Sequence, residues 1–509
     1  MKRHHRGGML FEMFGHNPQS IRDQMMRAAL LVDRGVRTEI LTKERPLLVV
    51  GAGAAGVAAA LRAFRKHNIS TILVEKEDRP FLRQLDSIRF VCPTQYDFPV
   101  SHWTKRWYPL DDGSDLPLRW KAARSQEIAV RWAKEFTDTF DAPDAGHRRF
   151  KSAAGAVFEF IPGASVEQIS HNSENHSSSV TVDRDRARMT RWAGMIIMAT
   201  GFGKERCAYP DDAPSAGHTT IKERFRSYNF WDADQIEEEI YVDKINRQFH
   251  AKGREHCTFV ISGGGDGGLQ DVLRLSFAKP ALEIFQNAFA RSEPLAREVI
   301  AALHCAEDQA HRALQIAGSD ADRDQIIFEL DQKHRELVDD IWDAKERHEK
   351  ALAHLPEDLG HSKKRDFERH GEWRCALSER MKEDFAAQVV DPEPYALHFI
   401  YGETFTPCYA LNRFLVLLLL KLSPEWLHEH RGVRLASVEG TGEHTCNDNA
   451  DACFARDHKV KLSTGEEISA QVIVLRHGFY NTKGKPIRMK QDVLPYFIPE
   501  FENEPMAAQ

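Results

Sequence analysis

Between residues 46 and 75 the pattern of apolar residues changes from that of a buried strand to that of a helix and back again. Leu47–Val50 and Thr71–Val74 are short, continuous apolar runs, the pattern of strands buried on both faces. Val57–Lys66 lies between them and is rich in alanine, which predicts a helix packed close to a sheet. The stretch therefore predicts a strand–helix–strand unit with parallel strands.

Helical and strand periods alternate on either side of this unit. Ser20–Arg34 has apolar residues at helical spacing and predicts an amphipathic helix, and Trp120–Phe140 predicts another. Residues 1–17 show no period and are expected to be disordered. Beyond residue 154 the period shortens, and strands are expected at Phe158–Ile161, Ser165–Ile169, Ser179–Asp183 and Met195–Met198.

The same order of elements occurs a second time. A strand is expected at Thr258–Ile261, a helix over Leu269–Leu275 and a buried strand at Val472–Leu475. The two hairpins open with the similar segments Ala164-Ser165-Val166-Glu167 and Ala436-Ser437-Val438-Glu439, and the two buried strands lead into Ala199-Thr200-Gly201 and Arg476-His477-Gly478. This internal repeat predicts two units of one fold.

A charged helical stretch, Ser276–Asp391, interrupts the second unit. From Ile327 to Ala351, apolar and small residues recur three and four apart, interrupted by two histidines, which predicts an antiparallel helical hairpin. A solvated hairpin is one interpretation, and a dimer contact or an active-site lid is the other. A strand at Tyr395–Tyr401 and a buried helix at Leu411–Leu422 follow.

A GxGxxG pattern joins the first strand to the first helix. Gly51 permits the tight turn, Gly53 allows a pyrophosphate to approach the backbone, and Gly56, with Ala54 and Ala55, allows close helix packing. The helix N-terminus adds free N–H groups and the positive end of a dipole. These features predict a dinucleotide site rather than a plain glycine-rich turn.

An acidic residue stands where such a site binds ribose. Glu75 ends the second strand, and its carboxylate suits a ribose diol and repels a 2′-phosphate. Lys76 follows it directly, and Arg83 and Gln84 are placed to reach the polar edge of the cofactor. The aromatic residues further on are either the lining of a flat pocket or ordinary core anchors: Tyr96, Trp103, Trp107 and Tyr108.

Composition narrows the class of protein. The 509 residues are expected to form two to four domains, and 42% hydrophobic and 28% charged residues describe an ordinary globular chain. A net charge of −7 gives no general attraction to nucleic acid or to an anionic membrane. The eight cysteines form no CxxC pair, and His428-Glu429-His430 lacks metalloprotease spacing, so no metal is assigned. No signal peptide or membrane span is apparent, and a cytoplasmic location is expected.

Two glycine loops, each followed by a hairpin and a strand that ends in ATG or its equivalent, resemble flavoproteins with two dinucleotide-binding domains. The order of elements is most similar to the flavin-containing monooxygenase-like branch. The resemblance implies FAD on the first unit, with Ala199, Thr200 and Gly201 as the crossover beside it. It implies NAD(P)H on the second unit, facing Gly263, Gly265 and Gly268. Tyr228–Trp231 stands where the family has an aromatic linker.

The sequence departs from this family in three places. Asp266 lies inside the second glycine loop, where a carboxylate repels a pyrophosphate unless it turns away, caps a helix or binds a cation. The strand that selects NAD or NADP is displaced or absent, because the helical stretch follows the loop. The glycine–aspartate motif that contacts the ribityl chain in relatives does not occur before the C-terminus.

The sequence thus predicts an α/β protein with two Rossmann-like dinucleotide-binding domains, β-hairpin excursions and a helical insertion in the second. The expected divisions are an N-terminal arm and helix (1–45), an FAD-binding domain (46–235, with a return of 476–509), an NAD(P)-binding-like domain (236–475) and the insertion (276–391).

The leading functional hypothesis is an FAD-dependent oxidoreductase, reduced by NAD(P)H, that passes electrons to oxygen or a small organic acceptor. A non-catalytic dinucleotide-binding sensor or scaffold with structural FAD is the alternative. A small-molecule substrate is expected, and the insertion is the surface for a second copy or a protein partner. No catalytic acid or base is assigned: Arg476 and His477 are either cleft residues or structural substitutes.

Overall fold

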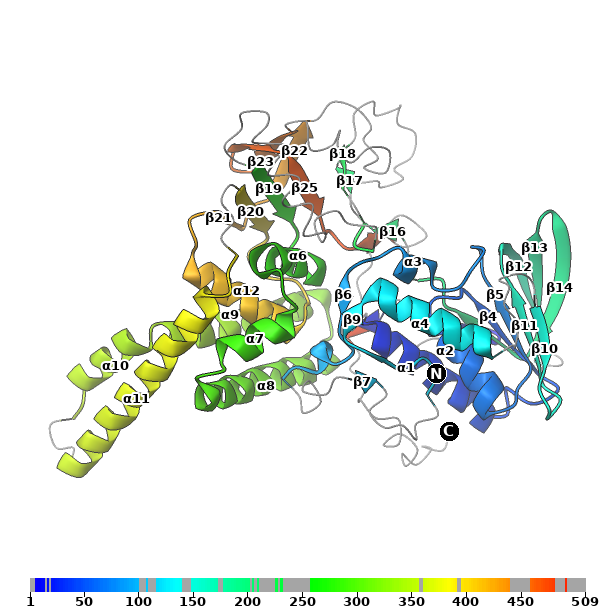
Figure 1. Cartoon of the computed structure of the whole chain (residues 1–509), viewed down its shortest axis with the longest axis horizontal. Coiled ribbons are helices and arrows are strands. Elements are labelled where there is room, and N and C mark those ends of the chain that lie inside the picture. Colours follow the sequence, from blue (N-terminus) through cyan, green and yellow to red (C-terminus); the bar gives the residue numbers. More distant parts are fainter. Residues whose placement is uncertain are drawn as a thin grey trace.

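A computed structural model describes residues 5–13, 16–17, 20–99, 107–108, 116–139, 148–172, 177–201, 204–205, 208–209, 225–227, 229–231, 257–356, 360–390, 395–439, 458–480 and 490–491. Figure 1 shows a β-rich body that contains the N-terminal half, a second sheet above it, and a group of helices from which one pair projects as an arm. Trp103 and Tyr228 of the sequence analysis lie outside the described residues.

The first unit is built on a seven-stranded sheet with the order β1-β2-β15-β4-β5-β11-β10. Its centre is β4 (Leu47–Val50), which pairs in parallel with β5 (Thr71–Val74) and with β15 (Met195–Met198). The outer strands are β1 (His5–Gly7), β2 (Leu10–Glu12), β11 (Val157–Ile161) and β10 (Arg148–Lys151). The short strands β4 and β5 are fully buried, as their continuous apolar runs require.

Each face of this sheet is covered by a different layer. One face packs on helices, among them α1 (Ile21–Arg37), α2 (Ala54–Leu61) and α4 (Ser125–Asp138), with the π-helical η2 (Arg62–Lys66) continuing α2. The other face packs on the three-stranded sheet β12 (Ala164–Asn172), β13 (Ser177–Arg184) and β14 (Ala187–Ala193). Both faces of the sheet are therefore apolar.

The second unit repeats this order. Its four-stranded sheet runs β21-β20-β19-β25, with β19 (Cys257–Ser262) parallel to β20 (Tyr395–Tyr401) and β25 (Val472–Leu475), and β20 parallel to β21 (Leu427–Arg431). A second three-stranded sheet, β22 (Leu435–Glu439), β23 (His458–Leu462) and β24 (Glu467–Ala470), covers one face. The repeat predicted from the two hairpins is thus present as β15-β4-β5-β11 and β25-β19-β20-β21.

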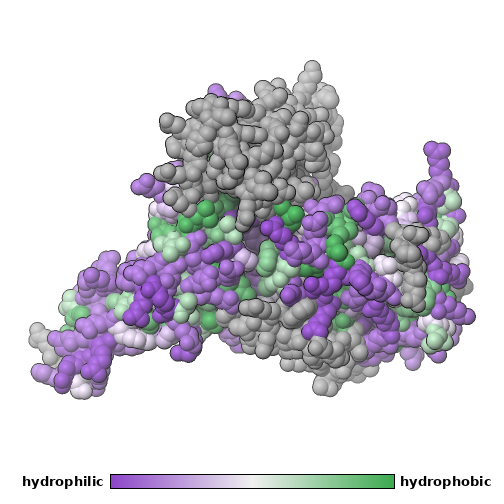
Figure 2. Space-filling view, viewed as in Figure 1, coloured by the Kyte–Doolittle hydropathy of each residue, from purple (hydrophilic) through white to green (hydrophobic). Residues whose placement is uncertain are grey.

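Helices fill the chain between α6 (Asp266–Phe277) and β20. They are α7 (Ala281–Ala288), α8 (Glu293–Ile316), α9 (Asp320–Trp342), α10 (Ala344–Ala353) and α11 (His361–Ala386). Among the described residues of this stretch there is no strand. α10 and α11 form the projecting arm in Figure 1, and its surface is mostly hydrophilic in Figure 2.

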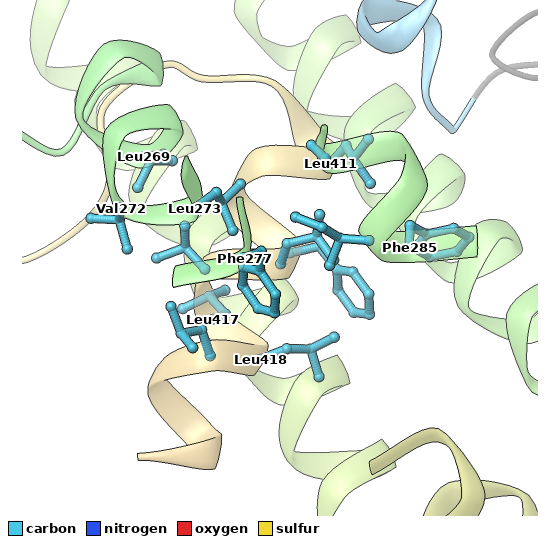
Figure 3. Close-up of a cluster of buried hydrophobic side chains, with 14 of the residues drawn as sticks. Leu269, Val272, Leu273, Phe277, Phe285, Leu411, Leu417 and Leu418 are labelled. Carbon is cyan, nitrogen blue, oxygen red and sulfur yellow. The ribbon is translucent and has the colours of Figure 1, made fainter. Parts of the chain in front are cut away.

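A single large core joins these helices to the second sheet. α12 (Ala410–Leu422) follows β20 and lies in this core, where Leu417 and Leu418 approach Phe277 of α6 (Figure 3). Phe285 of α7 also contacts Phe98, from the first unit, with ring centroids 4.9 Å apart. The helices of the stretch therefore contribute to the core of the second unit as well as to the arm.

Short elements complete the chain. They are β3 (His16–Asn17), α3 (Leu82–Leu85), β6 (Phe90–Val91), η3 (Gln95–Asp97), β7 (Trp107–Tyr108), β8 (Trp120–Lys121), β9 (Ala123–Arg124), β16 (Lys204–Glu205), β17 (Ala208–Tyr209), β18 (Phe225–Arg226), β26 (Phe479–Tyr480) and β27 (Lys490–Gln491).

Two expectations about local structure are wrong. Residues 1–17 are not disordered throughout, because β2 adds to the edge of the first sheet as a parallel partner of β15. The helix expected from Trp120 begins only at Ser125, because Trp120 pairs in β8 and its ring is fully buried against Trp132. In both places a tertiary contact outweighs the local pattern.

Three histidines face one another across β20 and β21. His398 Nδ1 and His430 Nε2 are 2.9 Å apart, and the His398 and His428 rings are 4.6 Å apart. The Glu466 carboxylate lies 3.8 Å from His430 Nδ1. Burial and the two neighbouring imidazoles lower the pKa of His398 to about 4. No group of three or more His, Cys, Asp or Glu among the described residues is arranged to hold a metal ion.

This cluster predicts a loss of stability in mild acid. Between about pH 6.5 and pH 4, His398 is protonated in the unfolded chain but neutral in the folded protein. The free energy of unfolding therefore falls as the pH falls through this window. Because His398 is partly exposed, we expect the loss to be on the order of 1 kcal/mol. Urea unfolding at pH 7.5 and 4.5 measures it. His398→Leu should flatten the dependence, whereas substitution of the exposed His304 on α8 should leave it unchanged.

Candidate functional site

The first glycine loop connects β4 to α2 with close backbone contacts. Gly51 has φ +102°, and its N–H donates to the Val74 carbonyl at 2.8 Å. A Cβ at Gly51 would collide with the Ala199 carbonyl oxygen, and a Cβ at Gly56 would collide with the Gly51 carbonyl oxygen. These two positions therefore require glycine for the turn and for the approach of helix to loop.

Gly53 is glycine for a different reason. Its φ of −73° suits any residue, and a Cβ built on it would meet no atom within 4 Å. It precedes Ala54, the first residue of α2, so the open space lies in front of a helix N-terminus. Free N–H groups with open space before them suit a phosphate. The loop fits the pyrophosphate that the sequence predicts at Gly53, Ala54 and Ala55.

Glu75 is fixed at the side of this loop. One carboxylate oxygen accepts the Ala52 N–H, and the other accepts the Glu77 N–H at 3.0 Å. The side chain is partly exposed and keeps lone pairs for further donors. A ribose diol next to a pyrophosphate on Gly53 is the ligand that suits it. Lys76, by contrast, points into solvent.

The crossover after β15 closes the other side. The Ala199 N–H donates to the Val50 carbonyl at 2.8 Å, and Gly201 has φ +83°. Arg83, in α3 with Gln84, places its Nη1 3.8 Å from the position of a Cβ on Gly201. Thr200 is exposed. The structure thus brings together Gly51, Gly53, Glu75, Arg83 and the crossover, residues at which the sequence predicts a dinucleotide.

The second glycine loop has the same backbone. Gly263 has φ +136°, its N–H donates to the Ile400 carbonyl at 2.9 Å, and a Cβ on it would strike the Arg476 carbonyl oxygen. A Cβ on Gly268 would strike the Gly263 carbonyl oxygen. Position by position, Gly263, Gly265 and Gly268 therefore correspond to Gly51, Gly53 and Gly56.

The selecting strand of the second unit is displaced, not absent. β20 takes the place of β5, and its register with β19 puts Tyr401 where the first unit has Glu75. The Tyr401 hydroxyl donates to Glu429 and accepts a hydrogen bond from Arg335 Nη2 at 3.0 Å. Burial is the main cause that raises the pKa of Tyr401 well above its usual range. The second loop consequently has no ribose-binding carboxylate at this position.

Thr406 fills the space that is open in the first loop. Its N–H donates to the Gly264 carbonyl at 2.9 Å, as the Phe81 N–H does to Ala52 at 3.0 Å. Its Oγ1, however, lies 3.0 Å from the position of a Cβ on Gly265. A pyrophosphate at Gly265 would therefore meet the Thr406 hydroxyl as a hydrogen-bond donor or displace it.

Asp266 turns away from its own loop. It is the first residue of α6, and its Oδ1 accepts the Tyr409 N–H and the Asn412 amide, each at 2.9 Å, at the start of α12. Burial raises the pKa of the carboxyl to about 7 against the effect of these two donors. Of the arrangements that the sequence left open, the structure has the one in which Asp266 turns away and caps a helix, but the capped helix is α12.

Arg476 and His477 act as structural substitutes in the second crossover. Arg476 is only 6% exposed, and its Nε donates to Asp271 Oδ2 at 2.8 Å. His477 Nε2 lies 2.9 Å from Ser262 Oγ at the end of β19. Tyr96 packs its ring 4.3 Å from that of Tyr409, and Tyr108 is 1% exposed, so both are anchors of the interior.

A buried ionic group joins the two units. We call it the Asp271 cluster: Asp271, Arg89, Arg274, Arg476 and Glu205. Asp271 is fully buried in α6 and accepts hydrogen bonds from all three arginines, including Arg89 of the first unit at 3.0 Å. Burial alone would raise the pKa of the Asp271 carboxyl, but the arginines hold it below the usual range.

Aromatic contact completes this junction. The Arg89 guanidinium lies 3.8 Å from the centre of the Phe230 ring, and the Phe230 N–H donates to Glu205. A Cβ on Gly267 would lie 3.3 Å from the Phe230 ring. The Asn229–Trp231 segment therefore lies between the first unit and the N-terminal turn of α6. The sequence pointed to an aromatic linker here but carried no sign of the Asp271 cluster.

Comparison with known proteins finds similarity to solved structures only. No protein-family model and no curated protein matches the chain. No helix in the described ranges is long and apolar enough to span a membrane.

Among solved structures, a cyclohexanone monooxygenase mutant from Rhodococcus sp. Phi1 bound to NADP+ has 13% identity and a TM-score of 0.33, over 86% of this chain and 73% of that one. An ornithine N-hydroxylase from Kutzneria sp. 744, with reduced FAD, NADP+ and L-ornithine, has 12% identity and a TM-score of 0.31, over 86% and 81%. An NAD-dependent persulfide reductase from A. fulgidus has 12% identity and a TM-score of 0.32, over 86% and 46%.

These neighbours are of the kind that the sequence resemblance named. Their TM-scores of 0.31 to 0.33 describe a loose superposition and carry no argument about chemistry.

Proposed function

We propose that the chain is an FAD-dependent oxidoreductase that is reduced by NAD(P)H and passes electrons to oxygen or to a small organic acceptor. The observation that carries the proposal is the first glycine loop, where open space before Gly53 adjoins the Glu75 carboxylate at a helix N-terminus. The repeat of that loop at Gly263–Gly268 supports a second dinucleotide on the same chain.

The residues of the first unit have distinct roles in this proposal. When bound, FAD supplies the exchange of electrons and of a hydride. The N–H groups at Gly53, Ala54 and Ala55 would hold its pyrophosphate at the positive end of α2. Glu75 would bind the ribose diol, and Arg83 would lie beside the crossover. No side chain is assigned as acid or base, because the cofactor carries the electron chemistry.

We assign the first unit to residues 46–235 with a return of 476–509, and the second to 236–475. Residues 1–45 supply β1, β2 and α1, and residues 276–391 form the insertion. The N-terminal residues therefore act with the first unit, since β2 pairs with β15.

The proposal predicts a yellow protein that bleaches with a reduced nicotinamide cofactor. Flavin released by heat into the supernatant should match FAD in chromatography and absorbance. Anaerobic stopped-flow mixing with NADH and with NADPH should then reduce the bound flavin. A purified full-length protein with no releasable flavin would contradict the proposal.

A second function is favoured by specific features of the second loop. Tyr401 replaces the ribose-binding acid, and the Thr406 hydroxyl stands before Gly265. Both suit a sensor or scaffold in which FAD is structural and no hydride donor binds. Tight FAD together with no reduction by either nicotinamide cofactor is the result expected from this alternative.

A further inference from the structure

The second glycine loop differs from the first at one charged position. Asp266 occupies the place that Ala54 has in the first loop, the first helical residue after the second glycine. A pyrophosphate bound at such a loop approaches the N–H groups of this turn. The second loop thus has an aspartate where the first has an alanine, and the aspartate carboxylate is directed toward the start of α12.

The carboxylate is held by neutral donors. Its Oδ1 receives the Tyr409 N–H and the Asn412 amide, and Asn412 Oδ1 in turn accepts a hydrogen bond from Gln95 Nε2 at 3.0 Å. These bonds fix the side chain between α6 and α12 and connect it to η3 of the first unit. None of these donors carries a charge that would balance the carboxylate.

Titratable groups from several elements surround the same point. They are Arg413 on α12, Glu307 on α8, Cys408 and Tyr409 before α12, and Tyr96 in η3. The one cation among them, Arg413, also lies 3.7 Å from both Glu307 and Asp331. Arg413 is therefore shared among three carboxylates, and burial raises the pKa of Asp266 to about 7.

We propose that Asp266 couples the binding of a dinucleotide pyrophosphate at the second glycine loop to proton uptake by its own carboxyl group. This inference rests on the proposed function, because it takes the ligand of that loop to be a nicotinamide dinucleotide. A bound pyrophosphate repels the ionised carboxylate and favours its protonated form. The protonated carboxyl keeps an oxygen as acceptor for Tyr409 and Asn412, so the fold of the loop need not change.

The sign of the effect follows from linkage. Binding raises the pKa of the carboxyl further, so the complex holds more protons than the free protein at neutral and mildly alkaline pH. Affinity should consequently rise as the pH falls from 9 to 6. A like charge at several ångströms in a partly buried site corresponds to a change of about tenfold.

The test is calorimetric titration of the full-length, FAD-saturated protein with NADP+ and with ADP-ribose, which carries the pyrophosphate without a 2′-phosphate. Titrations at pH 7.5 in two buffers of different ionisation enthalpy count the protons taken up, and a series from pH 6 to 9 gives the affinity. We expect proton uptake and about tenfold weaker binding at pH 9 than at pH 6 for at least one of these ligands.

Asp266→Asn is the decisive variant, because its amide oxygen still accepts from Tyr409 and Asn412. It should bind ADP-ribose at every pH as tightly as the wild type does at pH 6, with no proton uptake. Asp320→Asn, in the exposed first turn of α9, is the matched control and should behave as wild type. Without ligand, Asp266→Asn should melt higher than wild type at pH 8, and the difference should shrink as the pH falls from about 7 toward 4.

A failure of the proposed function and a failure of the inference about Asp266 give different results. If neither ligand binds the wild type or Asp266→Asn at any pH, the nicotinamide site of the proposed function is wrong and the inference falls with it. If a ligand binds the wild type without proton uptake and equally at pH 6 and 9, only the inference is overturned. Weaker binding by Asp266→Asn than by the wild type at pH 6 would also overturn it.

Discussion

Gly53→Val is expected to give a folded protein that has lost its flavin. The backbone at Gly53 has φ −73°, and a Cβ there meets no atom within 4 Å, so a β-carbon fits the folded protein without strain. The added isopropyl side chain would instead fill the space before the N–H groups of α2. We expect FAD affinity to fall on the order of a hundredfold or more, since charge-assisted hydrogen bonds to the pyrophosphate are lost. The ratio of flavin to protein after gel filtration measures this.

Gly360→Val is a matched control. Gly360 also has an unstrained φ, −54°, and open space around its Cβ position, but it stands before α11, away from either glycine loop. It should retain wild-type flavin content. A Gly53→Val protein with an unchanged melting temperature and a full complement of flavin would show that the first glycine loop is not the FAD site.

Asp271→Asn is expected to produce the largest loss of stability among substitutions that keep side-chain size. The change leaves Arg89, Arg274 and Arg476 around a neutral amide in a place where Asp271 is fully buried. Removing one partner of a buried ionic group costs about 3–5 kcal/mol, because the remaining charge stays uncompensated. The second unit, which contains Asp271, should then melt on the order of 10 °C lower.

Differential scanning calorimetry at pH 7.5 resolves this effect. Asp308→Asn is the control, because Asp308 pairs with Arg312 on the exposed face of α8 and should change the melting temperature little. Adding Arg476→Met to Asp271→Asn should recover part of the loss, since one uncompensated cation is removed. Equal melting of Asp271→Asn and wild type would mean that the cluster contributes no net stability.

The regular elements of both units were predictable because their strands are buried on both faces. Continuous apolar runs such as Leu47–Val50 and Val472–Leu475 have no polar face to expose to water, so they are expected to be buried. Both appear in the structure as strands with the predicted bounds. β2, by contrast, is three residues long and has no period of its own. It exists because the open edge of β15 supplies partners for its backbone, which no local pattern reports.

The residues of the candidate site could be predicted where they lie close to one another in the sequence. Gly51, Gly53, Gly56 and Glu75 lie within one strand–helix–strand unit, and their contacts follow from that unit. Tyr401 occupies the place of Glu75 in the second unit, but the insertion separates it from Gly263, so no spacing rule reaches it. The contact of Arg89 with Asp271 joins residues 182 positions apart and depends wholly on how the units pack.

The insertion between α6 and β20 also determines how the two sheets can assemble. The central pair of the first sheet joins Leu47 to Thr71, 24 residues apart, whereas that of the second joins Cys257 to Tyr395, 138 residues apart. Closing the longer loop as a random chain costs about 1.5 kcal/mol more in entropy. Helices α7 to α11 form from local contacts, and their docking shortens the effective loop before the strands meet. We therefore expect the strands β19 and β20 to pair later than β4 and β5 during folding, after the helices of the insertion have docked.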